Sequence, residues 1–73
     1  MEKITIRDHS IRLGQFLKLA AAVSTGGEAK ARIQAGEVEV NGGVETRRGA
    51  QLHAGDQVAI GGRCFVVVEA DEP

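Results

Sequence analysis

The sequence has few of the side chains that carry catalysis, metal binding or crosslinking. Its only cysteine is Cys64, and its histidines, His9 and His53, are far apart, so neither an internal disulfide nor the ligand spacing of a zinc site is present. Trp and Tyr are absent, and the two phenylalanines, Phe16 and Phe65, are expected to fill the core. Stacking of bases on aromatic rings is therefore not the expected way of binding nucleic acid. No apolar run approaches the roughly 18 residues of a membrane span.

Catalytic groups are equally scarce. Asp8, His9 and Ser10 are the residue types of a hydrolase triad, but they are consecutive, whereas a triad needs side chains from separate elements. The phosphate-binding pattern GxxxxGK is also absent. We therefore expect no catalytic residue, no metal, no cofactor and no small-molecule substrate. Cys64, in the apolar run 64–68, is expected to be a buried core thiol, and a small domain without disulfides fits a reducing cytoplasm.

What the sequence does have is the composition of one small globular domain. It comprises 73 residues, 42% hydrophobic and 26% charged, which predicts a single folded domain over residues 1–73. The net charge of −1 counts against a nucleic-acid partner. The charges are unevenly distributed, with six basic and four acidic groups in residues 12–48, but one basic and four acidic groups in residues 49–73. Either one modest basic face or a mixed surface without an electrostatic role is consistent with this distribution.

The first half of the chain has the patterns of a strand and two helices. Residues 3–7 alternate between polar and apolar side chains, which predicts a strand. Ser10 is a candidate N-cap for a helix from about 11 to 22. The apolar stripe of this helix is formed by Leu13, Phe16, Leu17 and Ala20.

The second helix has the clearest local signal in the chain. Thr25 and Glu28 have the spacing of a capping box, and Gly36 supplies a residue that can end the helix in the left-handed conformation. These signals predict a helix over 26–35. Glu28 and Arg32 are four residues apart in the favourable order for an ion pair.

Beyond Gly36 the apolar period changes from that of a helix to that of a strand. Two hairpin turns are predicted, at 41–43 and at 61–62. The predicted strands cover 37–40, 57–60 and 63–69, with the return of the first hairpin beginning at 44–46, a loop over 47–55 and an acidic tail over 70–73. The sequence thus predicts an α+β fold in the order β-α-α-β-β-β, with a helical hairpin on a small, mostly antiparallel sheet.

Several groups suit the binding of phosphate. Gly26 and Gly27 open the second helix, and exposed amides at a helix N-terminus attract anions, although glycine there would also permit close packing of the helices. Lys30 lies one turn further on. Arg47 and Arg48 form an adjacent pair whose planar guanidinium groups match phosphate oxygens. For any one of these residues, simple solvation is an equally good interpretation.

These patterns together resemble a known family, the S-four-type RNA-binding domain, which is named for the fourth protein of the small ribosomal subunit. The resemblance covers residues 11 to about 60. It is carried by Arg12-Leu13-(two residues)-Phe16-Leu17, by Thr25-(two)-Glu28-Ala29-Lys30-(two)-Ile33-(two)-Gly36-(one)-Val38-(one)-Val40-Asn41-Gly42, and by Gly55-Asp56-(one)-Val58.

The resemblance implies an αL motif, in which two helices and a hairpin lie against structured RNA through phosphates and shape. The family occurs in ribosomal proteins, pseudouridine synthases, tyrosyl-tRNA synthetases and small stand-alone factors, and this chain looks most like the small bacterial stand-alone members. The implied partner is ribosomal or transfer RNA, with the ribosome as a further candidate. Apart from the resemblance, the expected state of this chain is a cytoplasmic monomer without catalytic activity.

Residue by residue, the resemblance implies phosphate contacts from Arg12, Thr25 and Lys30. Many family members have arginine directly after the cap residue, where this chain has Gly26, and Arg47 with Arg48 would compensate. The full set of expected RNA-binding residues is Arg12, Thr25, Gly26, Gly27, Lys30, Gln34, Glu37, Arg47 and Arg48.

Another class of function remains open at this point. The piece Val38-(one)-Val40-Asn41-Gly42 and the later Gly55-Asp56 also look like parts of a ubiquitin-like sulfur carrier, which binds proteins. Such carriers end in Gly-Gly, whereas Gly61 and Gly62 are internal here, and their single helix lies between hairpins. A protein-interaction module with an exposed apolar patch is a second alternative.

Overall fold

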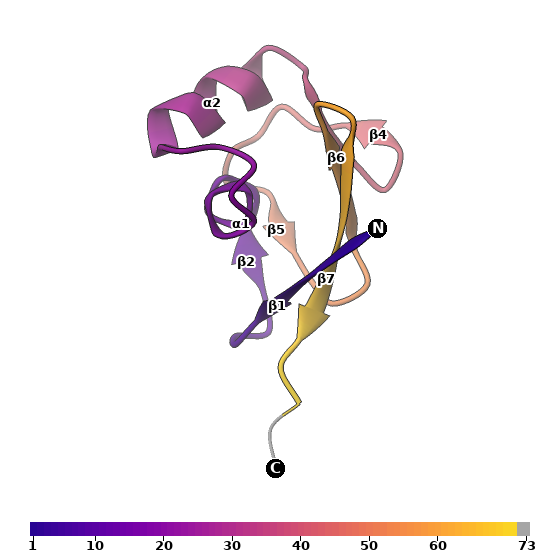
Figure 1. The fold of residues 1–73 in the computed structure, drawn as a ribbon. Helices are drawn as coiled ribbons and strands as arrows, with labels where there is room; N and C mark the ends of the chain where they lie inside the picture. Colours follow the sequence, from indigo (N-terminus) through magenta and orange to yellow (C-terminus); the bar gives the residue numbers. More distant parts are fainter. Residues whose placement is uncertain (72–73) are drawn as a thin grey trace.

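The computed structural model describes residues 1–71, and Figure 1 shows two helices lying to one side of the long strands. The helices are α1 (Leu13–Leu19) and α2 (Gly26–Gln34). The strands are β1 (Glu2–Ile6), β2 (Ile11–Arg12), β3 (Val38–Val40), β4 (Gly43–Val44), β5 (Gln51–Leu52), β6 (Gln57–Ile60) and β7 (Arg63–Glu69). The predicted tail over 70–73 lies partly outside the described residues.

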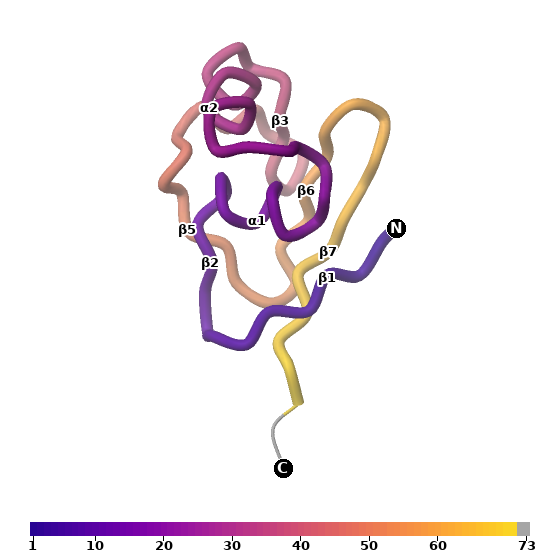
Figure 2. The backbone as a smooth tube through the Cα atoms, turned by 60° about the vertical axis from the view of Figure 1, so that its left-hand side comes forward, coloured from indigo at the N-terminus to yellow at the C-terminus, as the bar shows by residue number. Residues whose placement is uncertain are grey.

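The strands form one main sheet and one small ladder. The main sheet has the order β1-β7-β6-β3-β4, in which β1 pairs with β7 in parallel and the other neighbours are antiparallel. This arrangement confirms the predicted α+β fold with a mostly antiparallel sheet. The ladder pairs β2 with β5, and the two strands lie side by side in Figure 2. The prediction that 47–55 is entirely loop was therefore wrong, because Gln51 and Leu52 form β5.

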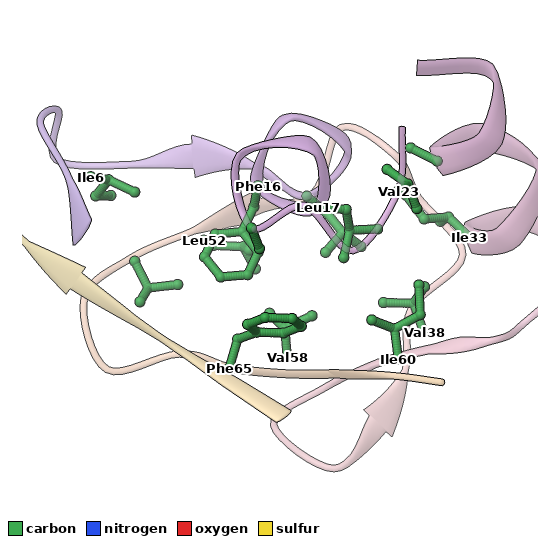
Figure 3. Packing of buried hydrophobic residues seen from close by; sticks show 14 residues of the cluster. Ile6, Phe16, Leu17, Val23, Ile33, Val38, Leu52, Val58, Ile60 and Phe65 are labelled. Atoms are coloured by element: carbon green, nitrogen blue, oxygen red, sulfur yellow. The ribbon is translucent and has the colours of Figure 1, made fainter. Parts of the chain in front are cut away.

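The core lies between the helices and one face of the main sheet. In Figure 3, Phe16 and Leu17 of α1 point toward Val58 and Phe65 of the sheet. The rings of Phe16 and Phe65 meet edge to face, with centroids 6.0 Å apart, and both residues are fully buried. Such pairs stabilise a core by about 0.5–1.5 kcal/mol beyond the burial of their area. Both aromatic residues are thus core residues, as the sequence predicts.

The first helix is shorter than the apolar stripe suggests. Its expected first residues form β2 instead, and Ser10 is not its cap: the N-cap is Arg12, in extended conformation. At the other end, the amides of Ala21 and Ala22 donate to the carbonyls of Lys18 and Leu17, which is the Schellman pattern. Ala21 takes the left-handed conformation there, with φ 56°. The usual glycine signal is missing, so the end of α1 could not be read from the sequence.

The second helix matches its prediction closely. The Thr25 hydroxyl accepts a hydrogen bond from the amide of Glu28 at 3.0 Å, and Gly36 ends the helix with φ 78°. The predicted pair of Glu28 and Arg32 is not formed. Glu28 instead accepts a hydrogen bond from the Ser24 amide at 2.8 Å, because the free amides before the helix attract its carboxylate.

Cys64 is exposed, which corrects the prediction of a buried thiol. Its neighbours Phe65 and Val67 face the core, at 0% and 1% exposure. Alternation along β7 therefore places Cys64 on the opposite face of the sheet, which the helices do not cover. An apolar run on a strand does not by itself distinguish a sheet that is covered on both faces from one that is covered on one face.

Candidate functional site

A hollow of about 320 Å³ lies between α1, the start of α2 and the segment that follows Arg47. Three cationic side chains, those of Arg12, Lys18 and Arg48, line it, and its lining includes no carboxylate. We call this hollow the basic pocket. Its lining residues are Arg12, Gly14, Gln15, Lys18, Gly26, Ala29, Arg48 and Gly49.

Backbone hydrogen bonds assemble the pocket from segments that are distant in sequence. The amide of Leu13 donates to the carbonyl of Ala50 at 2.8 Å. The amide of Gly14 donates to the carbonyl of Arg48 at 3.0 Å. The ladder between β2 and β5 continues this pairing. The first amides of α1, which have no partner within the helix, are thereby satisfied, and the segment that carries Arg48 is fixed against the helix.

Gly14 allows the side chain of Arg48 to lie across the start of α1. A Cβ atom at position 14 would be 2.7 Å from Cγ and 3.3 Å from Cδ of Arg48. The distance to Cγ is too short for two carbon atoms that are not bonded. The methylene stem of Arg48 therefore occupies the space that a side chain would need. Arg48 is thereby held beside α1, where it lines the basic pocket.

The cations of the basic pocket differ in their partners from the arginines that glutamates hold. Within residues 1–71, no carboxylate forms an ion pair with Arg12, Lys18 or Arg48. Arg47, by contrast, donates from Nε and Nη2 to the two carboxylate oxygens of Glu45 at 3.1 and 3.0 Å. This pairing lowers the pKa of Glu45 to about 2 and raises the pKa of Arg47. Unpaired cations that converge on one hollow are suited to bind an anion.

The start of α2 adds uncharged donors beside the pocket. Gly26 and Gly27 occupy the first two positions of the helix, where amides have no acceptor within the helix. Gly26 lines the pocket, and nothing lies within 4 Å of where its side chain would be. The space beside Gly26 is therefore open to a ligand. Glu28, in the same turn, partly offsets the attraction for an anion.

The structure brings together three of the nine residues that the sequence predicts for RNA binding. Arg12, Gly26 and Arg48 line the basic pocket. Thr25 and Gly27 lie directly beside Gly26, with the hydroxyl of Thr25 bonded to the Glu28 amide as the helix cap.

The other four predicted residues lie outside the lining of the pocket. Lys30 and Gln34 are exposed on α2. Glu37 accepts a hydrogen bond from Nε of Arg32 at 3.1 Å, and Arg47 is held by Glu45. Their roles in binding stay predictions.

Two polar residues of the pocket were not among those predicted. Gln15 and Lys18 are exposed and three residues apart, so they project from the same side of α1. Their position opposite the apolar stripe was visible in the sequence. What the sequence did not show is that this side of α1 faces the segment carrying Arg48.

Residues 1–71 contain neither a metal site nor a membrane-spanning helix. In this part of the chain, no group of three or more His, Cys, Asp or Glu side chains is placed to hold a metal ion. Neither α1 nor α2, with 7 and 9 residues, has the length or apolar character that crossing a bilayer requires.

A family model for the S4 domain matches residues 4–68. The chain belongs to the S4 domain family. This confirms the resemblance seen in the sequence. Two relatives of this S4 domain are similar over most of their length. "Probable ribosome maturation protein RlbA" of Bacillus subtilis (strain 168) is 48% identical over 59 residues, which cover 81% of this chain and 83% of the relative. YbcJ of Escherichia coli (strain K12) is 38% identical over 58 residues, covering 80% and 83%.

Solved structures share the fold of this S4 domain. The solution structure of YbcJ from E. coli, which is described as revealing an αL motif involved in RNA binding, superposes with a TM-score of 0.72 at 33% identity, covering 93% of this chain and 87% of YbcJ. The crystal structure of the 30S ribosomal protein S4e from Thermoplasma acidophilum gives a TM-score of 0.67 at 25% identity, covering 89% of this chain and 34% of that protein.

Proposed function

We propose that this S4 domain binds structured ribosomal or transfer RNA through the phosphates and catalyses no reaction. The observation that carries the proposal is the basic pocket, in which Arg12, Lys18 and Arg48 converge without a carboxylate. A cationic hollow beside free helix amides matches the charge and the acceptor oxygens of a phosphate group. We further propose that the protein acts as a cytoplasmic monomer.

The names of the relatives support RNA as the partner, and ribosomal RNA in particular. The B. subtilis relative is named for ribosome maturation, and the αL motif of YbcJ is described as involved in RNA binding. In our proposal, the cations of the pocket bind adjacent phosphates, and Lys30 adds a contact at the edge of this surface. The net charge of −1 implies that binding is weak outside a larger assembly.

Fluorescence anisotropy with a structured ribosomal RNA fragment, at several salt concentrations, tests the proposal. Each phosphate contact contributes about −0.7 to −0.9 to the slope of log K against log salt, so three contacts give roughly −2 to −3. Arg12→Ala with Lys18→Ala should reduce the magnitude of this slope by about 1.5 and weaken binding at least tenfold.

The control removes two positive charges elsewhere. Lys3→Ala with Arg32→Gln lowers the net charge equally, but neither residue lines the basic pocket. We expect this variant to bind RNA nearly as the wild type does. Equal losses in the two double variants would show that net charge alone, and not the pocket, determines binding. No binding at low salt would redirect the function to a protein partner.

A further inference from the structure

A second hollow, of about 600 Å³, lies between the segment from Thr5 to Ile11 and the exposed side of α1. Gln15 and Lys18 line both this hollow and the basic pocket. The two hollows are therefore neighbours on the surface of α1 and share these two side chains. The basic pocket can hold a phosphate, and the larger neighbour has the size of pockets that hold small organic groups.

The lining of this second hollow combines an apolar part with hydrogen-bonding groups. Ile6 is buried to 4% exposure and Ile11 is half-buried, while Leu19 of α1 remains 54% exposed. Among the helical residues of 1–71, Leu19 is the only large apolar side chain that is so exposed. Asp8 and Ser10, which belong to the same segment as Ile6 and Ile11, supply a carboxylate and a hydroxyl.

We propose that this second hollow binds one unpaired nucleotide of the RNA whose phosphates occupy the basic pocket. The proposal rests on the proposed function and adds the kind of RNA that is preferred. Lys18 lies between the hollows and binds the phosphate that joins the two positions. The base packs against Leu19 and Ile11, and its polar edge donates hydrogen bonds to the carboxylate of Asp8.

A nucleotide fits this hollow better than an apolar protein side chain does. The hollow lies next to a cationic pocket, and Arg7 and Lys18 add positive charge to its own lining. A nucleotide has the apolar face, the hydrogen-bonding edge and the negative charge that this lining complements. Proteins recognise RNA sequence chiefly through such unpaired bases, because side chains cannot read the narrow major groove of the RNA helix.

Binding to three matched RNA hairpins tests this proposal. The first has a single bulged guanosine, the second has an abasic residue at the same place, and the third is fully paired. Because the base would pack against Leu19 and Ile11, we expect the bulged hairpin to bind about tenfold more tightly than the other two, which corresponds to about 1.4 kcal/mol. Leu19→Ser should abolish this preference without weakening the binding of the paired hairpin.

Val44→Ser is the matched control, because Val44 is 63% exposed and belongs to β4 rather than to either hollow. It should keep the full preference for the bulge. Equal affinity of the wild type for all three hairpins would overturn the nucleotide site and leave RNA binding intact. A preference that survives Leu19→Ser would also overturn it. Failure of every hairpin to bind at low salt would remove the proposed function as well.

Discussion

The basic pocket and the surroundings of the main sheet both contain cations, but the two regions use them differently. In the pocket, Arg12, Lys18 and Arg48 have no carboxylate partner within residues 1–71. Around the sheet, three arginines are each held by a glutamate. These pairs are Arg32 with Glu37, Arg47 with Glu45, and Arg63 with Glu2.

Arg63 shows what the paired arginines do. Its guanidinium group donates to both oxygens of Glu2, at 3.0 and 2.8 Å, and lies 4.8 Å from the centre of the Phe65 ring. It also donates to the carbonyl of Ala21 at 3.4 Å, so it connects β7 with β1 and with the end of α1. Such exposed pairs stabilise a fold only slightly. Their main consequence is that the paired charges are offset, whereas the three cations that converge on the pocket are not.

The largest expected effect comes from the two adjacent arginines. Arg48→Gln should weaken RNA binding about tenfold, since a charge-assisted contact is worth roughly 1.5–3 kcal/mol, whereas Arg47→Gln should change affinity less than twofold. Both variants keep most of the side-chain stem and lose the same charge, so anisotropy with one RNA compares them directly. Equal effects would remove the distinction between paired and unpaired cations.

A substitution that adds a methyl group sharpens the same comparison. Gly14→Ala places a Cβ atom 2.7 Å from Cγ of Arg48, so the arginine must leave its position while its charge is retained. We expect an affinity loss of about fivefold to tenfold, similar to that of Arg48→Gln. Gly27→Ala is the control, because its Cβ would meet only the Thr25 hydroxyl oxygen at 3.8 Å. Full affinity in Gly14→Ala would show that the position of Arg48 is unimportant.

Thr25 tests whether the start of α2 is a structural or a binding element. Thr25→Ala removes the hydrogen bond to the Glu28 amide, and should lower the free energy of unfolding by about 1 kcal/mol. Urea denaturation measures this loss. Thr25→Ser retains the hydroxyl group and should be close to the wild type. If Thr25→Ala kept its stability but lost RNA affinity, the hydroxyl would belong to the binding surface.

The smallest expected effect is the pH dependence of stability that comes from the pairing of Glu45 with Arg47. Arg47 lowers the pKa of Glu45 from 4.5 to about 2, so the folded state holds this carboxylate ionised more strongly than the unfolded chain does. The resulting stabilisation is complete above about pH 4.5 and disappears as the pH falls toward 2. Glu45→Gln should therefore flatten the decline of the urea midpoint in this range. Glu39→Gln, which removes an exposed carboxylate of β3, should leave the decline unchanged.

Local signals along the chain determined much of the fold. The capping residues around α2 and the terminating Gly36 predicted that helix to within one residue, because caps act over three or four neighbouring positions. The strands β6 and β7 match their predicted ranges, since alternation and a two-glycine turn are also local. The apolar stripe likewise identified the buried residues of α1, while leaving both of its ends wrong.

The binding surface depended on contacts between distant residues. Arg48 reaches Gly14 because β2 pairs with β5, which are about forty positions apart and too short to be recognised alone. Pairing also decided which cations stay available, since Glu2 and Arg63 meet only through the register of β1 and β7. The sequence by itself thus determined the helices, the main strands and the family. Only the tertiary structure decided where positive charge converges, because charges add through space and not along the chain.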